Sequence, residues 1–262
     1  MQRPNTFIRL AASSALSFVL LTACLSPALA QDNDNKYHVC LQATPGIYWA
    51  STGDAASKSN GAKFGFGYGA NVEDRLTETI YFVFGLNVNA AGVKYSTNDS
   101  TQSLKSGTNT LVRSYANTSS SNASIQYLQI PLFLKMKTKS IGMMKYYGAF
   151  GLGSGFAISN NTAWTRTVAQ APGTAIVGNG SVSSYPTSGT DTKTADVNPI
   201  RESLLIGAGA EYNLSGSTSI TGSLMFDNGF ISAIPSGKTG PSGSVNPTLY
   251  TKGITLTVGI LF

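Results

Sequence analysis

The sequence predicts an all-β protein: an eight-stranded, antiparallel, up-and-down transmembrane β-barrel with four long extracellular loops and short periplasmic turns. Three observations predict it. Charged residues make up only 11% of the chain and hydrophobic residues 42%, whereas an ordinary soluble domain carries about 25% charged residues. Apolar and polar residues alternate along eight separate segments. The connections between these segments are short and long in turn, as in outer-membrane barrels.

The first element along the chain is an export signal. Arg3 and Arg9 precede the apolar stretch 10–25, and Ala28-Leu29-Ala30 follows as a small-x-small cleavage site. This order of basic, apolar and small residues is typical of a secretory signal peptide. We therefore expect a signal peptide at 1–30, cleaved after Ala30, and an outer-membrane β-barrel domain at 31–262.

Lipoprotein processing is the alternative for this segment. Leu21-Thr22-Ala23-Cys24 resembles a lipobox, which would place a lipid on Cys24. The small-x-small site lies at a natural distance beyond the apolar stretch, so it favours cleavage after Ala30.

Eight segments with period-two alternation follow the signal peptide. Their lengths suit tilted strands that cross a bilayer in about 9–11 residues. The expected strands are 36–49, 63–73, 78–95, 124–138, 144–159, 200–213, 217–231 and 250–262.

The alternation assigns a face to each side chain. In the fourth segment Leu132, Leu134 and Met136 share one side, while Lys135 and Lys137 share the other. The second, sixth and last segments divide in the same way. Alternation of this kind also occurs in a soluble sandwich, because one face of each of its sheets is buried.

The alternation of short and long connections distinguishes a barrel from a sandwich. The short connections lie at 74–76, 139–143 and 214–216, and the long ones at 50–62, 96–123, 160–199 and 232–249. Strict alternation indicates tight periplasmic turns and long external loops, with an even number of strands. Eight strands also give a lumen that side chains fill, without a wide channel.

Seven charged side chains fall on the inward face if the alternation holds. They are Lys63, Glu73, Lys135, Lys137, Arg201, Glu211 and Asp227. Four are positive and three negative, and a charge in a narrow lumen needs a partner or water. We expect an internal ion-pair network rather than a catalytic cluster, which would need a cleft and a substrate.

The last segment resembles the signal that the barrel-assembly machinery reads. Its pattern of a polar residue, glycine and alternating apolar residues is carried by Gly253, Leu256, Val258 and the terminal Phe262. The alternative is an ordinary amphipathic terminal strand. Aromatic residues near the strand ends predict girdles at both membrane interfaces. These are Tyr37, Tyr48, Trp49, Tyr81, Tyr95, Tyr127, Tyr146, Tyr147, Tyr212, Tyr250 and Phe262.

The sequence lacks the residues that several kinds of catalytic, metal and nucleic-acid site need. His38 is the one histidine, and Cys40 is the one cysteine after cleavage, so histidine-based triads and multi-histidine metal sites are not expected. The net charge of +6 comes from scattered basic residues without the basic run that nucleic-acid binding usually needs. We expect no catalytic residue, no cofactor, no metal and no nucleic-acid partner.

Four stretches carry a family resemblance. Residues 127–138 (YLQIPLFLKMKT), 146–151 (YYGAFG), 207–214 (GAGAEYNL) and 226–230 (FDNGF) resemble the PorT-like outer-membrane barrels of the Bacteroidetes, although Gln129 stands where that family usually has glutamate. The resemblance implies an eight-stranded barrel. It also implies a role as an accessory of type IX protein secretion, which is known for the best-studied member.

Two functional classes follow from these expectations. In the first, the barrel is a structural, interaction or secretion-accessory protein whose loops 96–123 and 160–199 contact a protein partner. In the second, it is a pore for small solutes. A membrane enzyme is a third class, but no nucleophile and base stand together in the sequence. The expected surroundings are outer-membrane lipid, lipopolysaccharide and the barrel-assembly machinery.

Overall fold

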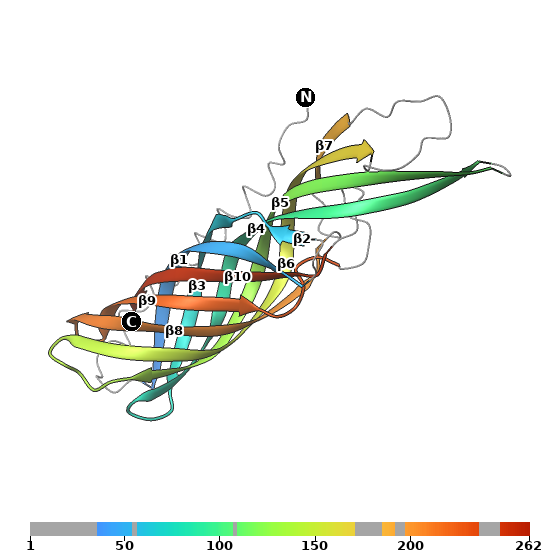
Figure 1. The fold of residues 1–262 in the computed structure, drawn as a ribbon. Coiled ribbons are helices and arrows are strands. Elements are labelled where there is room, and N and C mark those ends of the chain that lie inside the picture. Colours follow the sequence, from blue (N-terminus) through green and yellow to red (C-terminus); the bar gives the residue numbers. More distant parts are fainter. Residues whose placement is uncertain (1–35, 54–56, 107–108, 171–184, 192–196, 236–246) are drawn as a thin grey trace.

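The computed structural model describes residues 36–53, 57–106, 109–170, 185–191, 197–235 and 247–262. In this part of the chain, ten strands form one sheet (Figure 1). They are β1 (Tyr37–Thr52), β2 (Ser57–Ser59), β3 (Ala62–Arg75), β4 (Ile80–Ser106), β5 (Asn109–Lys137), β6 (Met144–Gln170), β7 (Tyr185–Asp191), β8 (Ile200–Ser215), β9 (Thr218–Gly229) and β10 (Leu249–Leu261). No helix of the described residues is long and apolar enough to cross a membrane.

Eight of these strands close into an antiparallel barrel. Each strand pairs with its neighbour in the order β1-β3-β4-β5-β6-β8-β9-β10, and β10 returns to β1 with Cys40 opposite Leu261. Closure gives every strand a hydrogen-bonding partner on both sides, as a membrane-spanning sheet requires. The predicted fold class is confirmed.

Tight turns connect the strands at one end of the barrel, which we call the short-turn end. The chain passes from β8 to β9 through Gly216 and from β5 to β6 through Gly142. Both glycines have positive φ angles, of 55° and 64°. Residues that carry a side chain rarely adopt a positive φ angle, so glycine is suited to these two positions.

At the opposite, long-loop end, the structure differs from the sequence prediction. Residues 96–123, expected as a loop, mostly continue β4 and β5 as one long hairpin, with Ser106 paired to Asn109. β6 extends to Gln170 and pairs with the short strand β7, inside the segment 160–199 that was also expected as a loop. Figure 1 shows this arm of β4, β5, β6 and β7 projecting well beyond β1, β8, β9 and β10.

The two faces of the barrel wall follow the predicted alternation. On β5, Leu132, Leu134 and Met136 are exposed, whereas Lys135 and Lys137 are buried. The same division holds along β3, β8 and β10. The outward apolar side chains form the belt that faces lipid, and the polar side chains fill the lumen.

The aromatic girdle prediction was wrong for five tyrosines. Tyr37, Tyr146 and Tyr212 are exposed, as a girdle requires. The lumen instead holds five others: Tyr48, Tyr81, Tyr95, Tyr127 and Tyr147 are all buried. Alternation within each strand places them inward, and a position near the end of a strand says nothing about the face.

Candidate functional site

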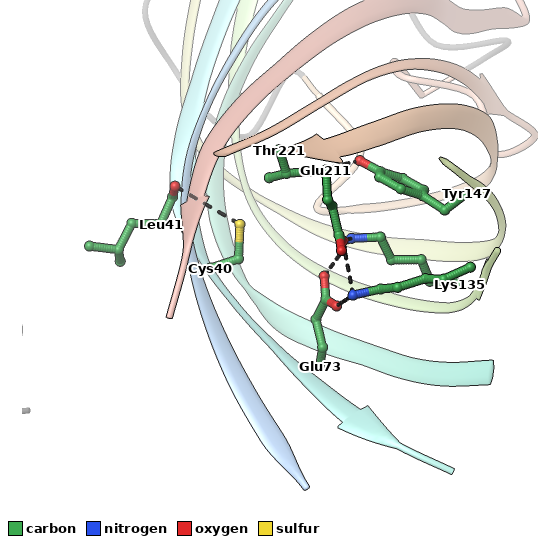
Figure 2. Close-up of polar contacts among 8 residues, drawn as sticks. Cys40, Leu41, Glu73, Lys135, Tyr147, Glu211 and Thr221 are labelled. Atoms are coloured by element: carbon green, nitrogen blue, oxygen red, sulfur yellow. Dashed lines mark hydrogen bonds and ion pairs between the residues drawn. The ribbon is translucent and has the colours of Figure 1, made fainter. Parts of the chain in front are cut away.

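Four charged side chains cross the lumen near the short-turn end. They are Glu73 on β3, Lys135 and Lys137 on β5, and Glu211 on β8, and all four are buried. We call this group the charge cluster. Figure 2 shows Lys135 reaching the carboxylates of Glu73 and Glu211.

The charge cluster is held by short ion pairs. Lys135 Nζ lies 2.6 Å from Glu73 Oε1 and 2.6 Å from Glu211 Oε1. Lys137 Nζ lies 2.6 Å from Glu73 Oε2 and 2.9 Å from Glu211 Oε1. Two positive and two negative charges balance, and mutual pairing offsets the large cost of removing each charge from water.

Two of the inward tyrosines cover the lysines of the charge cluster. Lys135 Nζ lies 3.9 Å from the ring centre of Tyr147, and Lys137 Nζ lies 4.1 Å from that of Tyr81. Cation–π attraction adds to the ion pairs when the ammonium is desolvated. The sequence pattern placed these rings in a girdle and so missed this contact.

A layer of amide and hydroxyl side chains follows toward the long-loop end. Thr44 Oγ1 donates to Asn89 Oδ1 over 3.3 Å, and Asn89 Nδ2 donates to Gln129 Oε1. This chain of hydrogen bonds links β1, β4 and β5 across the lumen. Gly67 makes room for it, because a Cβ atom there would collide with Asn89 and Thr44.

A cavity of about 80 Å³ lies between these layers. Asn71, Gln129 and Glu73 line it together with hydroxyl side chains, and apolar side chains such as Leu205 and Met225 complete the lining. This volume exceeds the minimum of about 15 Å³ that one water molecule needs. Asn71 Oδ1 and Gln129 Nε2 are buried there without a protein partner, so we expect water to satisfy them.

A second ion pair lies farther toward the long-loop end. Arg201 on β8 donates to both carboxylate oxygens of Asp227 on β9, with NH2–Oδ1 at 2.7 Å and NH1–Oδ2 at 3.1 Å. Both residues are buried, and the guanidinium lies 5.6 Å from the ring centre of Tyr127. A two-pronged contact of this kind fixes geometry more tightly than a single one.

An apolar core closes the lumen above this pair. Tyr95, Val93 and Ile125 from the strands pack with Val197 and Ile234 from the connections. The remaining members are Tyr48, Ala50, Ala91, Ala123, Tyr127, Ala233 and Leu249. Charged layers, amides and this apolar core therefore follow one another along the lumen, around a small cavity.

Lys63 is the one residue of the expected network that the structure places elsewhere. Its ammonium donates to Asn122 Oδ1 at 2.7 Å and Ser124 Oγ at 2.5 Å, and Asn122 is exposed on the outward face of β5. The β3–β4 pairing ends at Gly67 and Asn89, which frees the end of β3. Gly92 carries no side chain and leaves space for the Lys63 methylenes.

The residues of the expected assembly signal lie on β10, the strand that closes the barrel against β1, and at Phe262 directly after it. Leu256, Val258 and Phe262 are exposed on the lipid-facing side. Gly253 faces inward, where a Cβ atom would collide with the ring of Tyr48. This glycine therefore has a packing reason as well, and recognition by the assembly machinery stays a prediction.

His38 and Cys40 lie near the charge cluster. The His38 ring meets Tyr81 edge to face at 6.3 Å between ring centres, and the buried Cys40 thiol donates weakly to Leu41 O (Figure 2). Among the described residues, no group of three or more His, Cys, Asp or Glu side chains is placed to hold a metal ion.

Comparison with known families identifies the class of protein. The model of the family described as outer membrane protein beta-barrel domain matches residues 31–234, which is more than half of the chain. The chain therefore belongs to this family and is an outer-membrane β-barrel protein. No curated protein matches it.

Solved structures with a similar fold are distant in sequence. Ail, the attachment invasion locus protein of Yersinia pestis, has 12% identity and a TM-score of 0.30, over 87% of this chain and 100% of Ail. OprG of Pseudomonas aeruginosa has 10% identity and a TM-score of 0.36, over 86% and 94% of the two chains. The outer membrane protease OmpT of Escherichia coli has 9% identity and a TM-score of 0.35, over 88% and 97%. Because these scores and identities are low, nothing about function is carried over from these proteins.

Proposed function

We propose that this protein is a surface interaction protein of the bacterial outer membrane, in which the barrel anchors the projecting arm of β4, β5, β6 and β7. The observation that carries this proposal is the contrast between the occupied lumen of the barrel and the long arm that projects from it. The lumen is filled by the charge cluster, the Arg201–Asp227 pair and the apolar core. The sheet nevertheless continues far beyond it, with β4 and β5 paired as far as Ser106 and Asn109.

The reach of the arm supports contact with a partner. Residues 91–106 of β4 lie beyond the outward apolar residues, and they span about 50 Å at about 3.3 Å per residue. Residues 96–123 are rich in Ser, Thr and Asn and low in charge. Their backbone presents strand edges to which an extended partner can add. In this proposal the long-loop end faces the cell exterior.

Within this class, we propose the secretion-accessory role that the PorT-like resemblance implies. The resemblance rests on residues 127–138, 146–151, 207–214 and 226–230, which build the walls around the lumen. Assembly would depend on recognition of β10 through Gly253, Leu256, Val258 and Phe262. The lack of enzymatic activity is part of the same proposal.

Shortening the arm tests the interaction role. Asn98 and Thr118 are paired across the hairpin, so residues 99–117 can be replaced by an Asn-Gly turn, which suits a two-residue hairpin. In a strain that lacks the gene, the parent chain should restore protein secretion into the medium, and the shortened chain should not. Heat-dependent electrophoretic mobility serves as the control for barrel folding. Full restoration by a folded, shortened chain would contradict the proposal.

A small-solute pore is the second candidate. The cavity of about 80 Å³ between the two charged layers favours it, because an open space within the lumen would shorten the barrier that a solute must cross. An eight-stranded barrel is nevertheless much narrower than the 16–18-stranded barrels that hold open channels.

A further inference from the structure

Three lysines gather on the outward face of the wall where β2, β3 and β4 meet. Lys94 is paired in register with Asn122, the residue that accepts a hydrogen bond from Lys63. Lys58 on β2 is paired with Ser96, two residues from Lys94 on the same face of β4. We call Lys58, Lys63 and Lys94, with Asn122, the basic patch.

Hydrogen bonds hold the Lys63 charge in place. Its Nζ atom donates to Asn122 Oδ1 at 2.7 Å, Ala123 O at 3.3 Å and Ser124 Oγ at 2.5 Å. These contacts use all three of its N–H donors. Because Asn122 accepts through its oxygen, its Nδ2 group remains able to donate, and Asn122 is paired in register with Lys94.

The carboxylates whose side chains the structure describes lie away from the basic patch. Glu73, Glu211 and Asp227 are paired in the lumen. Asp74 pairs with Lys36, and Glu78 lies in the turn between β3 and β4, both at the short-turn end. Glu202 on β8 accepts from Ser154 on the other side of the barrel. Within the described part of the chain, Lys58, Lys63 and Lys94 have no salt bridge.

The basic patch lies just beyond the apolar belt. Outward positions on β5 are apolar from Met136 to Leu128 and polar from Gln126 onward. On β4 the outward face is apolar up to Ala90, which is paired with Gln126, and Lys94 lies four residues farther along. The headgroups of a lipid leaflet begin at this boundary.

We propose that the basic patch binds the anionic phosphate headgroup of a lipopolysaccharide-type lipid in the outer leaflet. Lys94 and the Asn122 amide donate to the phosphate oxygens, Lys63 supplies a fixed positive charge beneath them, and Lys58 extends the positive field along β2. Phe64 and Phe66 are exposed on β3, one and three residues after Lys63. They offer an apolar surface to the acyl chains of the same lipid.

Binding of lipopolysaccharide to the purified full chain in neutral detergent tests this site. Each lysine near a charged membrane surface contributes about fivefold in affinity, so Lys63→Gln/Lys94→Gln should bind about 25-fold more weakly than the parent chain. Lys139→Gln removes one charge from an exposed lysine at the short-turn end. It should bind like the parent.

Two further probes identify the ligand chemistry. Dephosphorylated lipopolysaccharide should bind the parent chain as weakly as intact lipopolysaccharide binds the double variant. Inorganic phosphate alone should not compete, because it lacks the acyl chains. Equal binding of lipopolysaccharide by the folded double variant and the parent would overturn the proposal. So would equal binding of the dephosphorylated lipid, or full competition by inorganic phosphate.

Discussion

The ammonium of Lys135 on β5 lies 2.6 Å from the Glu211 carboxylate on β8, although β6 stands between these two strands in the barrel wall. The same ammonium reaches Glu73 on β3, on the other side of β4. The charge cluster therefore connects strands that share no backbone hydrogen bonds. We infer that it fixes their relative positions and helps to close the lumen.

Removing one member of the charge cluster should destabilise the barrel more than removing a matched pair. Lys135→Met leaves two carboxylates with only Lys137, so we expect a loss of about 3–5 kcal/mol in the free energy of unfolding. The double variant Lys135→Met/Glu211→Gln retains Lys137 and Glu73, which are 2.6 Å apart, and should recover most of this loss. Urea unfolding in lipid vesicles measures both.

Lys139→Met is the control for this comparison, because Lys139 is exposed beyond the end of β5. Its free energy of unfolding should stay within about 0.5 kcal/mol of the parent value. Additive losses from Lys135→Met and Glu211→Gln in the double variant would show that the two residues are not coupled.

Two glycines on β6 offer a matched test of wall packing. A Cβ atom at Gly151 would collide with the backbone of Leu132 and Phe133 on β5, whereas a Cβ atom at Gly148 would meet nothing within 4 Å. We expect Gly151→Ala to lower the free energy of unfolding by about 1–3 kcal/mol through overpacking. Gly148→Ala should be neutral or slightly stabilising, because it restricts the unfolded chain. The same urea titration measures both, and equal effects would contradict this packing.

Cysteine labelling of intact cells tests the orientation. Ser120→Cys and Thr165→Cys, on exposed arm positions of β5 and β6, should react with a membrane-impermeant maleimide. Ser140→Cys and Ser215→Cys are equally exposed at the short-turn end and should react only after the outer membrane is opened. Cys40 is buried and should add little background. Labelling of Ser140→Cys on intact cells would reverse the orientation.

The sequence was enough to predict the barrel walls. Apolar and polar residues alternate along β3, β5, β8 and β10 because one face meets lipid and the other meets the lumen. This alternation is sufficient to predict that Glu73, Lys135 and Glu211 point inward. It also fixed most strand boundaries within about three residues.

The arm and the inner layers could not be predicted from the sequence, for physical reasons. Residues 96–123 are rich in Ser, Thr and Asn, so they carry no regular alternation of apolar and polar residues that would predict a strand. The Lys63 position depends on the end of the β3–β4 pairing, which is a tertiary property. Tyr81 and Tyr147 cover lysines inside the lumen. The sequence prediction placed both tyrosines at a membrane interface, because they lie near strand ends.

Planar-bilayer conductance tests the central claim, a barrel whose lumen is filled from the charge cluster to the apolar core. Purified protein inserted into a lipid bilayer should show no sustained current in simple salt solution, because ion pairs and apolar side chains occupy the lumen. The 16–18-stranded barrels that hold open aqueous channels provide the positive control. Sustained, solute-selective currents from the folded parent chain would contradict the account and support the pore.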